Sequence, residues 1–127
     1  MSKYGRISSI SISFIPHSSQ RYDTCGDWIL RNEKIILRIS KEMGFVSGLA
    51  VAVHELVEVV LCMFAGITQH QVDGWDLAHL EDPGEPGEIK GCPYFKQHAA
   101  ATIVERAVCL AFLMSWRTHN RNIEKCK

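Results

Sequence analysis

The sequence predicts an α+β fold, in which a small N-terminal antiparallel sheet is followed by three helices. Two observations predict it. Segments with the two-residue periodicity of strands lie within the first 40 residues, and segments with helical periodicity and capping signals occupy the rest. The 127 residues suffice for one domain with a real core but not for two. We therefore expect a single domain over residues 1–127, with a flexible tail from about residue 117.

The sheet is expected from three segments. Residues 7–15 alternate isoleucine and serine up to Pro16, which is the pattern of a strand with one apolar face. Residues 27–30 can form a short strand, and a turn over 31–33 joins it to a strand over 34–40 that is rich in β-branched residues. We expect these strands to pair in an antiparallel sheet.

The first and longest helix is expected to begin at Ser47, which can cap its N-terminus. It runs to about Ala65, where Gly66 provides a stop. Because the helix is apolar nearly all round, we expect it at the centre of the domain. The apolar stretch 45–67 is long enough to cross a membrane, but three ionisable residues near its middle would be costly in lipid. We therefore expect a buried helix and no membrane association.

Two further helices follow. Thr68 and Gln71 match a capping box, which predicts a helix over about 69–80. The segment 81–92, with its glycines, prolines and acids, is the one long loop. A third helix is then expected over about 94–116.

Composition narrows the classes of function. Fourteen basic residues balance fourteen acidic ones, so no global field would attract nucleic acid or an anionic membrane. The five cysteines form no CxxC pair and are odd in number, which favours a reducing compartment over a disulfide framework. The N-terminus lacks the basic and apolar regions of a signal peptide, so we expect a cytoplasmic protein.

Three ionisable side chains share one side of the first helix. His54 and Glu58 lie about 40° apart on the helical wheel, and Glu55 lies about 60° from Glu58. Burying an unpaired charge costs several kcal/mol, so three on an apolar helix need a partner. A divalent cation held by the imidazole and a carboxylate is one such partner. An ion pair with Lys41 or Arg106 is the structural alternative.

The third expected helix carries a matching pair. His98 and Glu105 are seven residues apart, about 20° on the wheel, on an otherwise apolar helix. If the two stripes face each other, His54, Glu58 and His98 can converge on one ion. Glu105 would be a fourth ligand or would orient a ligating histidine through its other ring nitrogen. The structural alternatives are a surface position for His98 and an ion pair between Glu105 and Arg106.

The second expected helix presents Asp73 and Asp76 on one face. They could add a metal ligand or hold an imidazole N–H, and the structural alternatives are binding of an arginine or a solvated face. Four other histidines have no evident partner and receive no expected role: His17, His70, His79 and His119.

The motif HELVE at positions 54–58 resembles the helix of zincins. There, two histidines four residues apart hold Zn²⁺, and the glutamate after the first is the general base. Here Glu58 replaces the second histidine, and a set of two histidines and one carboxylate leaves an open position for water. This predicts a zinc-dependent hydrolase, with Glu55 as the general base and His98 as the third ligand. The strand over 34–40 is placed to hold an extended peptide substrate by main-chain pairing.

A longer series of motifs carries a second resemblance. In order, the motifs are Gly26-Asp27-Trp28, HELVE, Gly66-Ile67-Thr68, Val72-Asp73-Gly74-Trp75-Asp76, and His98 with Val104-Glu105-Arg106. Over roughly residues 22–110 the chain thereby resembles a family of small phage and prophage proteins similar to zincin-like metallopeptidases. The resemblance implies a zincin-like arrangement of the α+β fold, a peptide or small-molecule substrate, and the host-cell cytoplasm as the location of a phage-encoded protein.

Two other hypotheses use the same residues. Glu55 and Glu58 form an ExxE motif, and Asp73 and Asp76 form a DxxD motif. The pair resembles the Mg²⁺ site of the all-α nucleotide pyrophosphohydrolases of the MazG type, and four carboxylates suit a hard cation such as Mg²⁺ or Mn²⁺. The other hypothesis is a phage-type accessory protein in which the metal is structural and no catalysis occurs.

Overall fold

A computed structural model of the protein describes residues 6–127, so the first five residues of the expected domain lie outside the described residues. Three strands precede four α-helices, in agreement with the predicted α+β class but with one helix more than expected. The strands are β1 (Ser9–Ile15), β2 (Gly26–Arg31) and β3 (Lys34–Ser40). The α-helices are α1 (Phe45–Ala65), α2 (Gln69–Ala78), α3 (Phe95–Ala111) and α4 (Trp116–Glu124), and short 3-10 turns are η2 (His17–Ser19), η3 (Lys41–Met43) and η4 (Pro86–Glu88).

The sheet is mixed, with the strand order β1-β3-β2. β2 and β3 form the predicted antiparallel hairpin, whose turn places Asn32 and Glu33 at positive φ. β1 pairs with the other side of β3 in parallel, so the expectation of an antiparallel sheet is wrong for this strand. The alternation of β1 identifies its apolar face but not its direction, and this face, with Ile10, Ile12 and Phe14, remains largely exposed. Because β1 and β2 pair with both sides of β3, the expectation that the strand at 34–40 holds a substrate main chain is also wrong.

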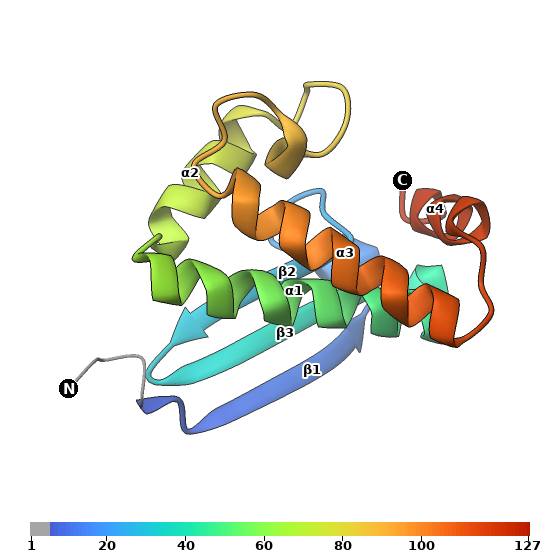
Figure 1. The fold of residues 1–127 in the computed structure, drawn as a ribbon, viewed down its shortest axis with the longest axis horizontal. Coiled ribbons are helices and arrows are strands. Elements are labelled where there is room, and N and C mark those ends of the chain that lie inside the picture. Colours follow the sequence, from blue (N-terminus) through green and yellow to red (C-terminus); the bar gives the residue numbers. More distant parts are fainter. Residues whose placement is uncertain (1–5) are drawn as a thin grey trace.

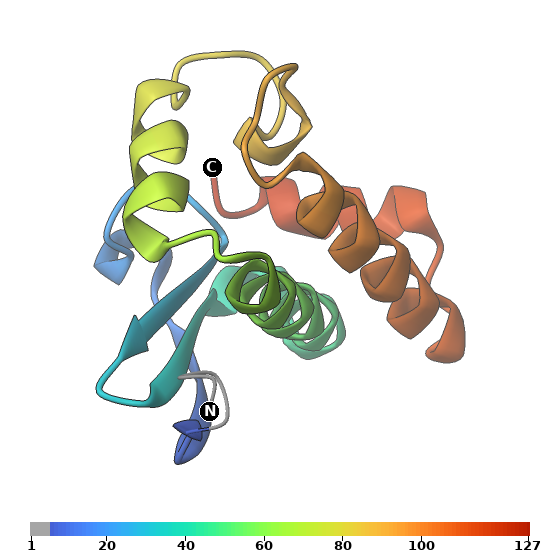
Figure 2. The same ribbon diagram turned by 60° about the vertical axis from the view of Figure 1, so that its left-hand side comes forward.

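The helices form two further layers over one face of the sheet. α1 crosses β2 and β3, and α3 packs along α1 on the side away from the sheet (Figures 1 and 2). The core between the sheet and α1 includes Trp28, Leu37, Val59 and Cys62, all buried. This stacking brings one side of α1 against α3, where the predicted site residues of both helices lie.

The sequence predicted the C-terminal end of α1 correctly but not its N-terminal end. The helix begins at Phe45 behind Gly44, which adopts a φ of 83°, and the expected cap Ser47 is instead a buried residue within the first turn. The C-terminus follows the prediction, because Gly66 adopts the left-handed conformation with a φ of 74°. The amide of Ile67 then donates to the carbonyl of Cys62 and closes the helix.

α3 ends at Ala111, five residues before the expected end at Trp116. Leu113 adopts a left-handed φ of 58°, and the amides of Leu113 and Met114 donate to the carbonyls of Leu110 and Cys109. These bonds make a Schellman motif, which usually contains glycine at the left-handed position. This break could not be predicted from the sequence, because a leucine occupies the left-handed position.

The segment from about residue 117, which was expected to be a flexible tail, lies in α4 (Trp116–Glu124) up to Glu124. Ser115 caps this helix by accepting a hydrogen bond from the amide of Thr118. Ile123 and Cys126 pack against Met43. α4 therefore docks on the turn before α1, and Figure 1 shows it folded back near the end of α3.

α1 is long and apolar enough to span a membrane by length and composition, as the sequence indicated. The core helix of a globular domain passes the same test, and α1 packs between the sheet and α3. Buried ionisable residues face α3 from the middle of α1.

The Schellman motif of α3 yields a stability prediction. Leu113→Gly should raise the free energy of unfolding by about 0.5 to 1 kcal/mol, because glycine adopts a positive φ without steric strain. Leu113 is 92% exposed, so its side chain contributes little burial. Leu110→Gly, at an exposed position inside the helix, should lower stability by about 1 kcal/mol. Urea denaturation measures both, and a loss of stability in Leu113→Gly would contradict the assignment of strain.

Candidate metal centre

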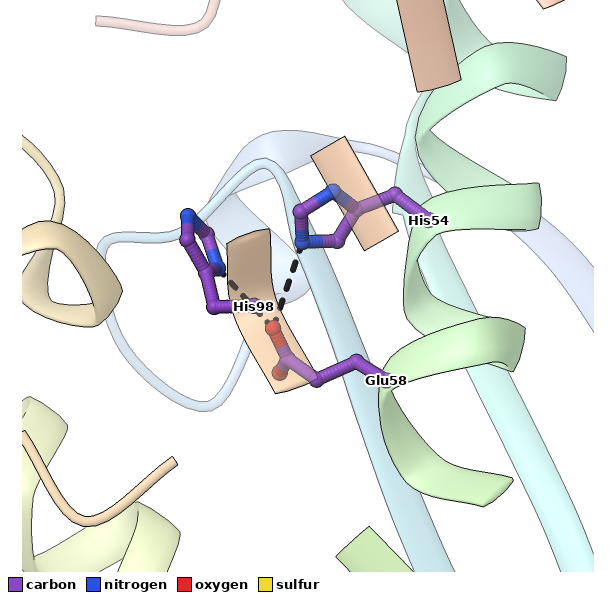
Figure 3. A group of neighbouring side chains, drawn as sticks. All are labelled: His54, Glu58 and His98. Atoms are coloured by element: carbon purple, nitrogen blue, oxygen red, sulfur yellow. Dashed lines mark hydrogen bonds and ion pairs between the residues drawn. The ribbon is translucent and has the colours of Figure 1, made fainter. Parts of the chain in front are cut away.

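Two helices bring three candidate ligands together. His54 and Glu58 come from α1 and His98 comes from the first turn of α3. Oε2 of Glu58 lies 3.2 Å from Nε2 of His54 and 2.9 Å from Nδ1 of His98, as Figure 3 shows. The three residues are buried, and they offer ligand atoms within 4.8 Å of one another. This group could hold a metal ion.

The sheet fixes the central carboxylate of this group. Nε1 of Trp28, on β2, donates a hydrogen bond of 3.0 Å to Oε1 of Glu58. Trp28 itself is buried in the core cluster below α1. One oxygen of Glu58 is thus held by the indole, and the other faces both imidazoles. A carboxylate oriented in this way is preorganised as a single-oxygen ligand.

Each imidazole also contacts a carboxylate through its other ring nitrogen. Nδ1 of His54 lies 2.8 Å from Oε1 of Glu105 on α3, and Nε2 of His98 lies 3.0 Å from Oε2 of Glu85. A carboxylate at the far nitrogen is the usual partner of a metal-binding histidine, because it fixes the ring and its tautomer. From the sequence, we predicted this orienting role for Glu105 as one of two alternatives. It missed Glu85, because nothing in the local pattern shows where a long loop folds.

The loop approaches His98 closely because of a glycine. A Cβ at Gly87, in the turn η4, would lie 2.4 Å from Cγ of His98. Only glycine therefore fits at this point without displacing the ring. Glu88, from the same turn, has an oxygen 4.0 Å from Nε2 of His98.

Glu55 lies beside the three candidate ligands and makes only a longer contact with one of them. Its Oε2 is 3.8 Å from Nε2 of His54, on the side of the ring that faces Glu58. The start of β2 packs against it, because a Cβ at Gly26 would lie 3.1 Å from Cγ of Glu55. Glu55 is therefore a buried carboxyl group next to the candidate ion position, where the predicted general base would be.

Burial and the charges of neighbouring side chains set the pKa values of the groups in this cluster. Burial opposes the charged form of His54, but contacts with Glu105 and Glu58 outweigh it and raise its pKa to about 11. The same balance, with Glu58 and Glu85 as partners, raises the pKa of His98 to about 10. Burial acts against ionised Glu58 too, yet the two imidazoles lower its pKa to about 2. Burial and the nearby Glu58 raise the pKa of Glu55 well above its usual value.

The cluster opens into a cavity of about 390 Å³. Besides the cluster residues, its lining includes Asp76 of α2 with Tyr22 and Tyr94. Both tyrosine hydroxyls donate to the Asp76 carboxylate, and burial raises the pKa of this carboxyl group to about 6. Asp76 is thus anchored by phenols in the same cavity and does not contact either candidate imidazole.

Asp73 takes the structural alternative named for it, which is to bind an arginine. Arg21 binds it at 2.9 Å and binds the buried Asp27 of β2 at 2.7 Å, so the guanidinium ties α2 to the sheet. Within residues 6–127, the two ExxE and DxxD carboxylate pairs do not form a group of ligand atoms. Because Asp73 is paired with Arg21, only three of the four carboxylates of the MazG-type hypothesis are free to bind a metal ion.

Among residues 6–127, the structural alternatives named for His98 and Glu105 do not occur. His98 is buried, not a surface residue. Arg106 lies over the ring of Trp116, with its guanidinium carbon 4.5 Å from the ring centroid. Glu105 contacts two histidines, His54 and His119, where an ion pair with Arg106 was the alternative.

His119 of α4 is a second site residue that the sequence did not predict. It is fully buried, and its Nε2 lies 2.5 Å from Oε2 of Glu105. A signal was present, because Trp116, His119, Ile123 and Cys126 recur at helical spacing after a serine that can act as a cap. The basic residues between them gave the segment the composition of a solvated tail.

Comparison of the chain with protein-family models, curated proteins and solved structures found no match. Within the described part of the chain, two groups of side chains could hold an ion. One is the buried set of His54, Glu58 and His98. The other joins His98 to the exposed Glu85 and Glu88, and it shares its imidazole with the first.

The buried imidazoles predict a pH dependence of stability. The pKa values of His54 and His98 in the folded protein, about 11 and about 10, exceed the ordinary 6.5. The folded state therefore binds more protons than the unfolded state above pH 6.5. The stabilisation is complete below pH 6.5 and is lost as the pH rises toward 10–11. Each imidazole contributes up to ~1.4 kcal/mol per pH unit across this window.

Urea denaturation with a chelator between pH 6.5 and 8.5 measures this slope before most thiols titrate. His98→Gln should reduce the slope by roughly half, because one of the two bound protons is removed. His70→Gln, at an exposed position on α2, serves as the control and should leave it unchanged. Stability that is independent of pH in the native sequence would contradict the charged cluster.

Proposed function

We propose that this protein is a metal-dependent hydrolase whose ion is held by His54, Glu58 and His98. The observation that carries the proposal is the convergence of two imidazole nitrogens on one buried carboxylate oxygen from two different helices. Zn²⁺ is the first choice of ion because two imidazoles and a carboxylate form an established catalytic zinc set. Mg²⁺ or Mn²⁺ are the alternatives, and they would favour a larger share of oxygen ligands.

The residues fit such an ion by charge as well as by geometry. Two imidazolium protons and one divalent cation carry the same charge, so an ion can replace the protons of His54 and His98 without upsetting the balance. Glu105 and Glu85 would keep the rings oriented during the exchange. The ionised Glu58 needs no deprotonation, because its pKa is already low.

A bound zinc ion would supply Lewis acidity and lower the pKa of water in the cavity. Glu55 would accept the proton of the attacking water, because it is adjacent to the ligands without being one of them. A nearby cation favours the carboxylate form and so offsets the effect of burial on Glu55. Tyr94 lines the same cavity and is the candidate donor to a developing oxyanion, although its hydroxyl donates to Asp76 in this structure.

The proposed substrate is a peptide or a small molecule that enters the cavity beside β2. Gly26, Asp27 and Trp28 of this outer strand line the cavity, so β2 takes the role first expected of β3. We further propose a cytoplasmic location, in the host cell if the protein is phage-encoded, and no nucleic-acid or membrane partner. The resemblance to zincin-like phage proteins and the neutral charge balance support these points.

Metal content tests the ligand set. Protein purified without chelator should contain about one zinc ion per chain by mass spectrometry, and chelation followed by zinc titration should restore it. His54→Ala and His98→Ala should weaken binding by more than ~100-fold, which exceeds the usual effect of an outer partner. His70→Ala, which removes an exposed histidine, is the matched control and should bind like the native protein.

Retention of native zinc affinity in both His54→Ala and His98→Ala would contradict the proposed ligands. Magnesium-dependent turnover of a deoxynucleotide that survives His98→Ala would favour the nucleotide pyrophosphohydrolase instead.

Glu55→Gln separates binding from catalysis. The variant should keep zinc within about threefold, because Glu55 is not a ligand, and should lose ~10²–10⁴-fold in hydrolysis for want of the general base. The assay is cleavage of labelled casein and a peptide library by the zinc-loaded protein. If the native protein binds zinc and cleaves none of these or a panel of small esters and amides, the metal is structural, as in the accessory-protein hypothesis.

A further inference from the structure

A chain of buried polar contacts continues from the candidate ion position to the C-terminal helix. Nδ1 of His54 contacts Oε1 of Glu105 at 2.8 Å, and Oε2 of the same carboxylate contacts Nε2 of His119 at 2.5 Å. Nδ1 of His119 then lies 3.0 Å from Oγ of Ser47 on α1. Asn122 of α4 donates to this hydroxyl at 3.0 Å. The chain thus begins and ends on α1 after passing through α3 and α4.

The hydrogen atoms of this chain have a defined direction. The contact of His119 with Glu105 is a hydrogen bond, whereas the contact of His54 Nδ1 with Glu105 is an ion pair that lacks hydrogen-bond geometry. An ionised carboxylate has no hydrogen of its own, so both nitrogens that face Glu105 carry hydrogen. For His54 this places a hydrogen on Nδ1, and the Nε2 atom that faces Glu58 is then the one available to an ion. The contact of His119 with the other oxygen keeps Glu105 from rotating away from His54. A carboxylate with a single partner would lack this restraint.

We propose that His119 is a positioning residue for the metal ligand His54 and acts through Glu105. The proposal rests on the metal site proposed above. It makes α4 part of that site, although the polar contacts of His119 are with Glu105 and Ser47 and not with the candidate ligands themselves. Because the coupling is reciprocal, an ion at His54 also stabilises the docking of α4 against α1 and α3.

Three variants of the full chain test the role of His119. His119→Leu removes the contact with Glu105, and His119→Gln keeps an N–H group at about the position of Nε2. Arg106→Gln is the matched control, because it removes a different α3–α4 contact, the one with Trp116. Zinc titration against a competing chelator gives the affinity, and amide hydrogen exchange of α4 with and without zinc gives the reciprocal effect.

His119→Leu should weaken zinc binding by about 10- to 100-fold, which is the range for partners of metal-binding histidines. His119→Gln should recover most of this loss, and Arg106→Gln should bind like the native protein. Zinc should slow amide exchange in α4 of the native protein and lose this effect in His119→Leu. Native affinity in His119→Leu, or an equal loss in Arg106→Gln, would overturn the proposal.

A measurement without metal keeps this test separate from that of the hydrolase. In metal-free protein, NMR should show a slowly exchanging Nδ1–H proton of His54 in the native sequence and in His119→Gln. In His119→Leu that proton should exchange rapidly with water, because Glu105 is no longer restrained. If the native protein binds no zinc, the proposed function fails, while this proton still decides whether His119 positions His54.

Discussion

The neutralisation of Glu58 is the interaction on which the rest of the site depends. Its carboxylate is buried between the sheet and two helices, where an unpaired charge would cost several kcal/mol. One oxygen is satisfied by the indole of Trp28 and the other by His54 and His98. These contacts require β2, α1 and α3 to hold fixed positions, so the packing of the helices and the geometry of the candidate ligands are a single arrangement.

The same cluster can satisfy its charge in two ways. Without an ion, protons on His54 and His98 offset the buried carboxylates, and the raised pKa values of both imidazoles express this. With a divalent cation, the two protons would be released and the rings would become ligands, while Glu105 and Glu85 would still contact their other nitrogens. Metal binding and protonation would therefore compete for one set of atoms. A site of this kind needs little rearrangement to accept an ion.

Much of the fold could be predicted because local signals agreed with the final packing. The hairpin of β2 and β3, the capping box of Thr68 and the stop at Gly66 are all encoded within a few residues. The direction of β1 is set by contacts distant in sequence, and the end of α3 depends on a leucine in a conformation that usually selects glycine. Such features follow from tertiary structure, which a pattern in one segment does not carry.

The candidate site likewise contains residues that the sequence predicted and residues that it did not. Helical periodicity placed His54 and Glu58 on one face and gave α3 its matching stripe of His98 and Glu105, and the structure brings these residues together. Glu85 was missed because it reaches the site from a long loop, and its position depends on the close approach of Gly87. The aspartates of α2 were equally plausible from spacing alone. Their partners, Arg21 and two tyrosines, come from segments far away in the sequence.

A crystal structure of zinc-loaded protein, with anomalous scattering data collected at the zinc edge, tests the ligand set directly. We expect one peak between α1 and α3, about 2.0–2.2 Å from Nε2 of His54, Nδ1 of His98 and a carboxylate oxygen of Glu58. A peak elsewhere on the chain, or an ordered cluster with no peak at saturating zinc, would contradict it.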